Sequence, residues 1–306
     1  MRRGPGRGGK EEGLLRGGPP RTQRGMLPMM RVSEKGLVTR RCIEKRLEAA
    51  NRRGRLFPGG LARDLTTSAV LFTVGPAPFG AFRDDPCLIL NKRSQRVKQP
   101  GDLCFPGGRT APRLDCWLSK VLQLPLSPLT RWPGWPAWRR ERPREARRLA
   151  LLLATGLRES FEEMRLNPFG VSFLGPLPSH SLEIFQRVIY PMVAWVGWQK
   201  RFLPNWEVEK VVCIPLRHLL QNSRYAFYRV EMRGLEAVRP GKFVEDFPCF
   251  VHQDGGQREL LWGATYRIVM LFLKVVFDYS PPPERVLPVI HGVLKGSYFS
   301  AVPSQG

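Results

Sequence analysis

The chain has 306 residues, of which 42% are hydrophobic and 10% aromatic, with 49 Lys and Arg against 26 Asp and Glu. This length and apolar content exclude a wholly disordered protein and allow one good core with insertions. The formal charge of +23 attracts phosphate groups on nucleotides, nucleic acids or membrane surfaces, without distinguishing among them.

The six cysteines and four histidines are scattered along the chain, and no Cys-x-x-Cys pair occurs. This pattern argues against a disulfide framework and against a zinc site. It fits a reducing compartment, so we expect a cytoplasmic protein.

The first 32 residues predict a flexible tail rich in Gly and Arg. Residues 1–40 hold ten basic and three acidic residues, and MRRGPGRGGK lacks the apolar stretch of a secretory signal. Alternatively, translation begins upstream of a true start at Met26 or Met30. No apolar run reaches the length of a membrane span, since Lys274 interrupts RIVMLFLKVVF.

The next part of the chain predicts a helix, two strands and a glycine turn in succession. Residues 34–53 have amphipathic spacing and predict the helix. TTSAVLFTVG at 66–75 and PCLILNKRS at 86–94 predict strands, and GDLCFPGG at 101–108 predicts a short strand that enters a glycine turn.

A segment rich in Trp, Pro and Arg follows at about 109–142 and includes WPGWPAWRRERPRE. From Pro143 the spacing becomes helical, and proline suits the first turn of a helix. We expect this helix to stop at Asn167-Pro168, because Asn tolerates a left-handed cap and Pro cannot extend a helix.

The C-terminal half alternates predicted strands and helices. The predicted strands are 171–177, 185–196, 225–232 and 247–253, and the predicted helices are 215–221 and 259–277. After three prolines, residues 281–306 are expected to be loosely ordered. The mixture predicts a single domain of the α/β class over residues 33–280, with the 109–142 segment inserted into it.

Three carboxylates gather in GLRESFEEMRL, at residues 156–166 of this basic chain. Glu159, Glu162 and Glu163 stand at i, i+3 and i+4, so a helix places them on one face. The apolar side of the same helix is formed by Leu153, Leu157, Phe161 and Met164. The carboxylate face is either a solvated acidic surface, with Arg158 and Arg165 nearby, or a seat for metal ions.

The context of these carboxylates resembles the Nudix hydrolases. That family's box runs Gly-x5-Glu-x7-Arg-Glu-hydrophobic-x-Glu-Glu-x-Gly-hydrophobic. RESFEE at 158–163 matches its Arg-Glu-x-x-Glu-Glu core, and Gly107 and Gly108 match its opening glycine turn. LILNKRSQRVKQPGDLCFPGG at 88–108 is similar to the signature upstream of the box in the coenzyme A diphosphatase subfamily.

The resemblance implies an α/β/α sandwich with a mixed β-sheet between helices. It also implies metal-dependent hydrolysis of a diphosphate linkage in a small-molecule nucleotide. The subfamily substrate is coenzyme A or acyl-CoA, and the products are 3′,5′-adenosine bisphosphate and (acyl-)4′-phosphopantetheine.

Site residues follow from the same resemblance. Mg²⁺ or Mn²⁺ is expected on Glu159, Glu162 and Glu163, because hard cations take carboxylate oxygens. Arg158 is expected to orient a glutamate. Proton abstraction is assigned to one of the helix carboxylates or to a loop carboxylate, for which Glu207 and Glu209 are the candidates.

Substrate contacts are expected upstream of the helix. Phosphate contacts are expected from four cations, each of which could instead be an ordinary solvated side chain: Lys92, Arg93, Arg96 and Lys98. Gly107 and Gly108 would allow close backbone approach to metal or phosphate, or simply form a tight turn.

The chain departs from the family pattern in several places. About 50 residues separate Gly108 from Arg158, where the uninterrupted pattern needs about 15. Asp115 is the nearest candidate for the first acidic position, Arg165 replaces the closing glycine, and Gln99 replaces a histidine that the subfamily often carries.

Two other functions remain open at this point. One keeps the enzyme and changes the substrate to another nucleoside diphosphate derivative or to capped RNA, for which the tryptophans and arginines of the insertion would be suited. The other is a non-catalytic domain that binds nucleotide or RNA. We expect the insertion to be a lid or side wall, with Trp117, Trp132, Trp135 and Trp138 packed against the domain. The oligomeric state is not predicted.

Overall fold

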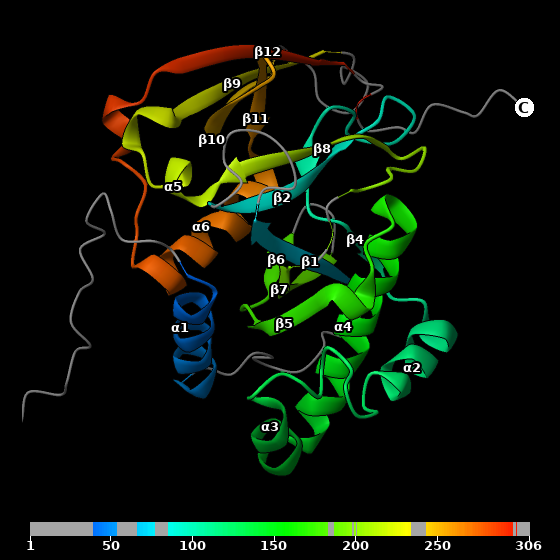
Figure 1. Cartoon of the computed structure of the whole chain (residues 1–306). Coiled ribbons are helices and arrows are strands. Elements are labelled where there is room, and N and C mark those ends of the chain that lie inside the picture. Colours follow the sequence, from blue (N-terminus) through cyan, green and yellow to red (C-terminus); the bar gives the residue numbers. More distant parts are fainter. Residues whose placement is uncertain are drawn as a thin grey trace, which may run out of the picture. The chain divides into compact units, whose positions relative to one another are not determined.

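The computed structural model describes residues 39–53, 66–76, 85–182, 187–197, 199, 201–233, 243–295 and 298. The tail predicted at 1–32 lies outside the described residues. The elements that follow are labelled in Figure 1.

The larger sheet has eight strands, and its main path runs β3-β2-β1-β7-β5. Its strands are β1 (Thr66–Pro76), β2 (Pro86–Arg93), β3 (Leu103–Cys104), β4 (Gly107–Arg109), β5 (Val171–Pro176), β6 (His180–Leu182), β7 (Arg187–Val196) and β8 (Val208–Pro215). β4 also pairs with β1, β6 with β7, and β8 with β2. β1 and β7 are parallel while the other pairs are antiparallel, so the sheet is mixed.

Helices cover both faces of this sheet. Alternate residues of β1 point to opposite faces, so they pack in two different cores. Phe72 and Val74 pack in one core with residues of α1 (Arg40–Arg53) and α6 (Gly263–Phe277). Ala69 and Leu71 pack in a second core with α4 (Pro143–Met164). The result is the α/β/α arrangement with a mixed central sheet that the sequence predicts (Figure 1).

A second sheet of four strands runs β11-β10-β9-β12. Its strands are β9 (Tyr225–Arg233), β10 (Phe243–Asp254), β11 (Gln257–Leu261) and β12 (Val289–Lys295). Short helices precede β9 and β12: α5 (Leu216–Leu219), η3 (Asn222–Arg224) and η4 (Glu284–Val286).

The second sheet changes two expectations. Residues 257–261 are a strand paired with β10, so the helix predicted at 259–277 begins only at Gly263. Residues 289–295, in the stretch expected to be loosely ordered, pair in parallel with β9. Both strands are stabilised by backbone hydrogen bonds to another strand. Local sequence pattern does not predict such pairing.

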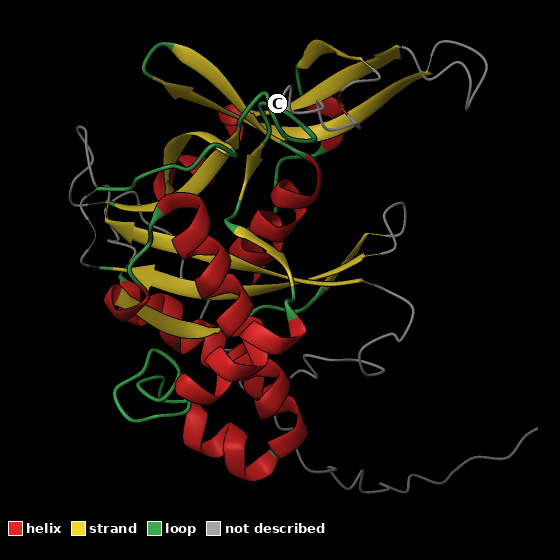
Figure 2. Cartoon of the chain, turned by 90° about the vertical axis from the view of Figure 1, so that its right-hand side faces the viewer, coloured by secondary structure: helices red, strands yellow, loops and turns green. Residues whose placement is uncertain are grey.

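The insertion is largely helical and packs on α4. It holds α2 (Pro112–Val121) and α3 (Trp135–Glu141), and both contact α4 (Figure 2). Three of its tryptophans are buried: Trp132, Trp135 and Trp138 are 3%, 4% and 7% exposed. Trp117, which was expected to pack as well, is 61% exposed.

The three buried rings join the core between α4 and the sheet. The Trp132 ring lies 5.1 Å from the Phe173 ring of β5 and 5.8 Å from the Trp138 ring, centroid to centroid. α3 directly precedes the first turn of α4, whereas the carboxylates occupy the last two turns. This part of the insertion is therefore a side wall of the core, and its tryptophans do not form a lid over the carboxylates.

Candidate functional site

The glycine turn and the carboxylate helix, about 50 residues apart in sequence, meet beside β1. Gly107 and Gly108 pair with Val70 and Ala69 of β1, on the side where α4 packs. A Cβ atom added to Gly107 would lie 2.4 Å from the Ala69 carbonyl oxygen. One added to Gly108 would lie 2.4 Å from Oε1 of Glu159. Glycine is therefore required at 107, where a side chain would meet the backbone of β1, whereas at 108 the Glu159 carboxylate occupies the space that a side chain would fill.

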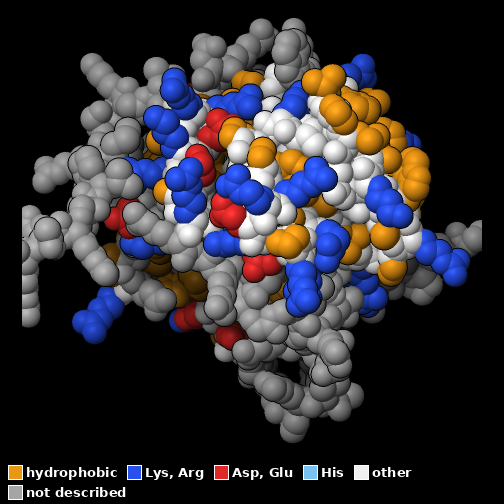
Figure 3. Space-filling model, turned by 90° about the horizontal axis from the view of Figure 1, so that it is seen from below, with side chains coloured by type: hydrophobic (Ala, Val, Ile, Leu, Met, Phe, Trp, Pro, Cys, Tyr) orange, Lys and Arg blue, Asp and Glu red, His pale blue; other side chains and the backbone are white. Residues whose placement is uncertain are grey.

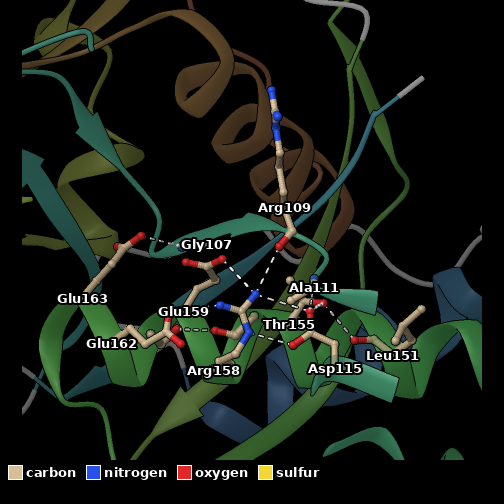
Figure 4. A network of polar contacts seen from close by, with 12 residues as sticks. Gly107, Arg109, Ala111, Asp115, Leu151, Thr155, Arg158, Glu159, Glu162 and Glu163 are labelled. Atoms are coloured by element: carbon tan, nitrogen blue, oxygen red, sulfur yellow. Dashed lines mark hydrogen bonds and ion pairs between the residues drawn. The ribbon is translucent and has the colours of Figure 1, made fainter. Parts of the chain in front are cut away.

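Glu163 points into this junction (Figure 4). Its Oε1 accepts a hydrogen bond from the Gly107 amide at 3.4 Å, and its Oε2 accepts one from the Asn91 side-chain amide at 2.7 Å. Burial raises the pKa of Glu163 to about 7, and the negative charges of Glu159 and Glu207 act in the same direction. The carboxylate thus lacks a full counter-charge, which a cation would supply.

Glu159 lies between the glycine turn and Arg158. Its Oε1 accepts a hydrogen bond from Nη2 of Arg158 at 3.0 Å. Burial raises the pKa of Glu159 although the charge of Arg158 opposes the shift. Glu162, one turn along, is exposed and accepts a hydrogen bond from Nη1 of Arg158 at 3.0 Å.

Arg158 is the hub of the network drawn in Figure 4. Besides the two glutamates, it donates to Oδ1 of Asp115 at 2.7 Å and to the Arg109 carbonyl oxygen at 3.1 Å. Burial disfavours the charge of Arg158, but the hydrogen bond to Asp115 and the surrounding carboxylates raise its pKa. The guanidinium therefore stays charged and holds the carboxylates in a fixed arrangement.

Asp115 anchors Arg158 from the insertion. It is fully buried, and its Oδ2 accepts hydrogen bonds from the Ala111 amide at 2.7 Å and from the Thr155 hydroxyl at 2.8 Å. The sequence alone identifies Asp115 only as the nearest candidate for the first acidic position of the Nudix pattern. The available signal was that Asp115 is the sole acidic residue between 109 and 140.

The donor chemistry of the junction fits a hard divalent cation. Glu159 and Glu163 present oxygens beside a turn without side chains, and the buried Asn91 Oδ1 has no hydrogen-bond partner among the described residues. However, the described part of the chain contains no group of three His, Cys, Asp or Glu side chains already arranged to hold a metal ion. Binding would therefore require the glutamates to turn toward one another.

The two loop carboxylates have different surroundings. The charge of Glu207 raises the pKa of Glu163, and the Glu207 amide donates to the Asn205 side chain at 2.9 Å. Glu209 lies 3.2 Å from Nζ of Lys92, which also lies 3.1 Å from Oε1 of the buried Glu259. The structure therefore places Lys92 and Glu209 in an ion-pair cluster, together with Lys210, which is 2.9 Å from Glu259.

Of the other three predicted phosphate-binding cations, Arg93 is the last residue of β2, and Arg96 and Lys98 lie on the loop that follows it. Nε of Arg93 donates to the Lys98 carbonyl oxygen at 2.7 Å and so helps to close this loop. Arg96 and Lys98 are exposed. These two side chains have the access to solvent that a phosphate-binding role requires.

An aromatic cluster secures the end of the same loop. Asp102 accepts hydrogen bonds from the Trp262 indole at 3.1 Å and from the Tyr298 hydroxyl. Burial raises the pKa of Asp102 to about 6, although both hydrogen bonds lower it. Sequence reasoning missed this contact because its three members are scattered over 196 positions.

Comparison with known proteins gives distant structural similarity only. No protein-family model matches the chain, and no curated protein matches it. A Nudix hydrolase from Alicyclobacillus acidocaldarius is 16% identical, with 52% of this chain and 82% of that one covered and a TM-score of 0.34. A Caenorhabditis elegans Ap4A hydrolase complex is 11% identical, with 51% and 84% covered and a TM-score of 0.32.

The Nudix domain of Shewanella oneidensis NrtR, complexed with ADP ribose, is 13% identical, with 51% and 77% covered and a TM-score of 0.29. Similarity this distant assigns neither family nor substrate. Among the described residues, no helix has the length and apolar character needed to cross a membrane.

Proposed function

We propose that the chain is a Nudix-type hydrolase that cleaves a diphosphate linkage in a nucleotide derivative with the help of Mg²⁺ or Mn²⁺. The observation that carries the proposal is the junction of the FPGG turn with the RESFEE helix. A Cβ atom at Gly108 would collide with Glu159, and Gly107 donates to Glu163, although the two motifs are about 50 residues apart. A merely solvated acidic face would not need such an approach.

The oxygens of Glu159 and Glu163 would hold the cation, with Glu162 and Glu207 at the margin. Once bound, such a cation neutralises phosphate charge and lowers the pKa of a bound water. The chain's own contribution is orientation. Asp115 fixes Arg158, and Arg158 fixes Glu159 and Glu162.

Glu163 is suited to move a proton. Burial brings its pKa to about 7 in the metal-free chain, and a bound cation would lower that pKa, so Glu163 serves as a base only when it does not hold the cation. Glu207 lies close enough to influence that pKa and is the second candidate base. Glu209 is the weaker candidate, because it is paired with Lys92.

Coenzyme A or acyl-CoA is the substrate we propose within this class. Support comes from the resemblance of residues 88–108 to the coenzyme A diphosphatase signature and from the exposure of Arg96 and Lys98. These two cations are suited to the 3′-phosphate that distinguishes coenzyme A from its dephospho form. Hydrolysis would yield 3′,5′-adenosine bisphosphate and (acyl-)4′-phosphopantetheine.

The alternatives are another nucleoside diphosphate derivative, capped RNA, and a non-catalytic binding domain. The RNA alternative loses part of its basis, because Trp132, Trp135 and Trp138 are buried and cannot stack on bases. The non-catalytic alternative is disfavoured because Arg158 and all three helix glutamates are retained.

A substrate panel with the purified chain tests the proposal. The panel contains coenzyme A, dephospho-coenzyme A, ADP-ribose, diadenosine tetraphosphate and capped RNA, each with and without Mg²⁺ or Mn²⁺. We expect metal-dependent turnover that is fastest on coenzyme A. The variants Glu159→Gln and Glu163→Gln should lower kcat by about 100-fold or more, because each removes charge from the proposed cation site.

Glu48→Gln is the control, since Glu48 is a glutamate of another helix, α1, where it pairs with Arg52 four residues along. It should leave kcat unchanged. An Arg96→Ala/Lys98→Ala variant should lose the preference for coenzyme A over its dephospho form. Absence of metal-dependent turnover on every substrate would refute the proposed hydrolase activity. Turnover of a different substrate would refute only the proposal that coenzyme A is the substrate.

A further inference from the structure

Helix α2 is amphipathic, but its polar side faces the domain and its apolar side faces solvent. Its buried residues are Asp115 and Ser119, which face the domain. Leu114, Trp117 and Val121 are exposed and fall within about 60° of the helical circumference. A helix that only had to cover α4 would place these side chains the other way round.

The apolar surface continues beyond the helix. Leu124 is 58% exposed and Leu126 is 81% exposed. We call the five residues Leu114, Trp117, Val121, Leu124 and Leu126 the apolar patch. They lie within 13 consecutive residues, and exposed apolar side chains gathered in this way mark an interaction site.

The turn that carries the two leucines is held in place. Leu126 has a φ of 65°, which is unfavourable for a branched side chain. The Thr130 hydroxyl donates to the Leu124 carbonyl oxygen at 3.0 Å, and the Ser127 amide lies 3.1 Å from the same hydroxyl. Backbone strain maintained by surrounding contacts is typical of functional segments.

The charges around the patch are positive. Arg113 and Lys120 lie beside it on the exposed side of α2, and neither has an ion-pair partner among the described residues. Residues 109–140 contain six Lys and Arg, while their only acidic residue, Asp115, is buried against Arg158. Seen from below, where α2 and α3 lie in Figure 1, hydrophobic side chains gather among lysines and arginines (Figure 3).

We propose that the apolar patch docks the protein on an anionic lipid surface. Exposed leucine and tryptophan side chains can enter the boundary between headgroups and acyl chains, while flanking cations attract anionic headgroups. A second copy of the chain fits less well, because a self-complementary contact would bring Arg113 and Lys120 close to their own copies. RNA also fits less well, because Trp117 is the only ring of the patch that could stack on a base.

This inference does not depend on the proposed hydrolysis. The test is co-sedimentation of the full chain with vesicles of phosphatidylcholine alone or mixed with phosphatidylglycerol. We expect binding to the mixed vesicles only. The variants Trp117→Ser and Leu124→Ser/Leu126→Ser should each lower the partition coefficient by about tenfold or more, because they remove apolar area from the contact.

Leu203→Ser is the matched control, because Leu203 is 53% exposed, similar to Leu124, and lies outside the patch. It should leave the partition coefficient unchanged. Arg113→Glu/Lys120→Glu should weaken binding as well. Trp117 also provides a second readout: vesicles should shift the tryptophan emission to shorter wavelength in the natural chain but not in Trp117→Phe.

Three outcomes would overturn the proposal. One is the absence of binding to anionic vesicles. Another is binding that the patch variants leave unchanged, which would assign the lipid attraction to the basic residues 1–32. The third is a dimer that the patch variants dissociate without any change in vesicle binding, which would make the patch an interface between copies.

Discussion

Arg165 ends α4 in a conformation that suits glycine. Its φ of 54° and ψ of 37° are left-handed, and it follows directly on Met164, the last residue of the helix. The last helical residue, Met164, is therefore three residues before the predicted stop at Asn167, and Asn167 instead caps the short turn at Pro168–Gly170. The Nudix pattern that this segment resembles has glycine here, which is the residue that a left-handed backbone favours.

We expect Arg165→Gly to stabilise the protein by about 0.5–1 kcal/mol, because glycine adopts a left-handed backbone without a steric cost. Loss of the exposed stacking of Arg165 on Phe161 offsets part of the gain. Urea denaturation measures the difference. Arg147→Gly, in the body of the same helix, is the control and should cost about 1 kcal/mol.

Asp115 and Arg158 form a buried pair whose removal should affect both stability and activity. Asp115→Asn leaves the Arg158 guanidinium, which is 11% exposed, without its main counter-charge. We expect a loss of about 2–4 kcal/mol in the free energy of unfolding. We also expect a lower kcat, because Arg158 then loses the anchor with which it fixes Glu159 and Glu162.

Thr155→Val is the milder comparison, since it removes only one hydrogen bond to Asp115 and should cost about 1 kcal/mol. Equal effects of the two variants would show that the charge of Asp115 is unimportant.

At the scale of elements, the insertion has two parts with opposite surroundings. Its second part buries Trp132 against Phe173 of β5, whereas its first part exposes Trp117 on α2. The apolar side of α4 shows a similar exception. Phe161, predicted to be in the core with Leu153, Leu157 and Met164, is 46% exposed.

Two tryptophan substitutions distinguish the parts of the insertion. Trp132→Ala should cost about 3–5 kcal/mol, because it leaves a cavity in the core between α4 and the sheet. Trp117→Ala should change the free energy of unfolding by less than about 0.5 kcal/mol, because its ring is already in solvent. Denaturation of both variants by urea checks this, and a large cost for Trp117→Ala would mean that α2 packs differently.

The contact of Asp102 with Trp262 and Tyr298 makes stability depend on pH. The folded pKa of about 6 is above the usual aspartate value near 4, so the folded state retains a proton that the unfolded state releases. The contribution of Asp102 to stability is therefore present below about pH 4 and is lost as pH rises to about 6.

The natural chain should lose this contribution between pH 4 and pH 6, whereas Asp102→Asn has none to lose. The free energy of unfolding of Asp102→Asn minus that of the natural chain should therefore rise by about 2–3 kcal/mol over this range and stay constant above it. Urea denaturation across this pH range measures it. Tyr298→Phe removes a hydrogen bond that lowers the pKa of Asp102, so it should move the transition to higher pH. A pH-independent difference for Asp102→Asn would contradict the assignment.

At the scale of the whole molecule, the described residues combine an α/β/α sandwich with a second sheet. Residues 88–109 link the two, because β3 of the first sheet lies against β11 of the second. Trp262 and Tyr298 reach the same region from the C-terminal part of the chain. The proposed substrate loop thus rests on elements from both sheets.

The α/β class and most strand and helix positions are readable from local sequence, and the glutamates of the candidate site remain a prediction from a motif. These depend on local periodicity and on a motif, both of which are readable within a few residues. The positions of α4, β1, β2, β5 and β7 accordingly agree with the prediction within about two residues at nearly every end.

Which distant residues meet is fixed by the packing of sheets and helices. The burial of Asp115 against Arg158, the contact of Lys92 with Glu259 and the pairing of β12 with β9 all join residues tens to hundreds of positions apart. No local pattern encodes such contacts, because side-chain type sets only the preference for burial or pairing. The partner is chosen when the sheets and helices pack.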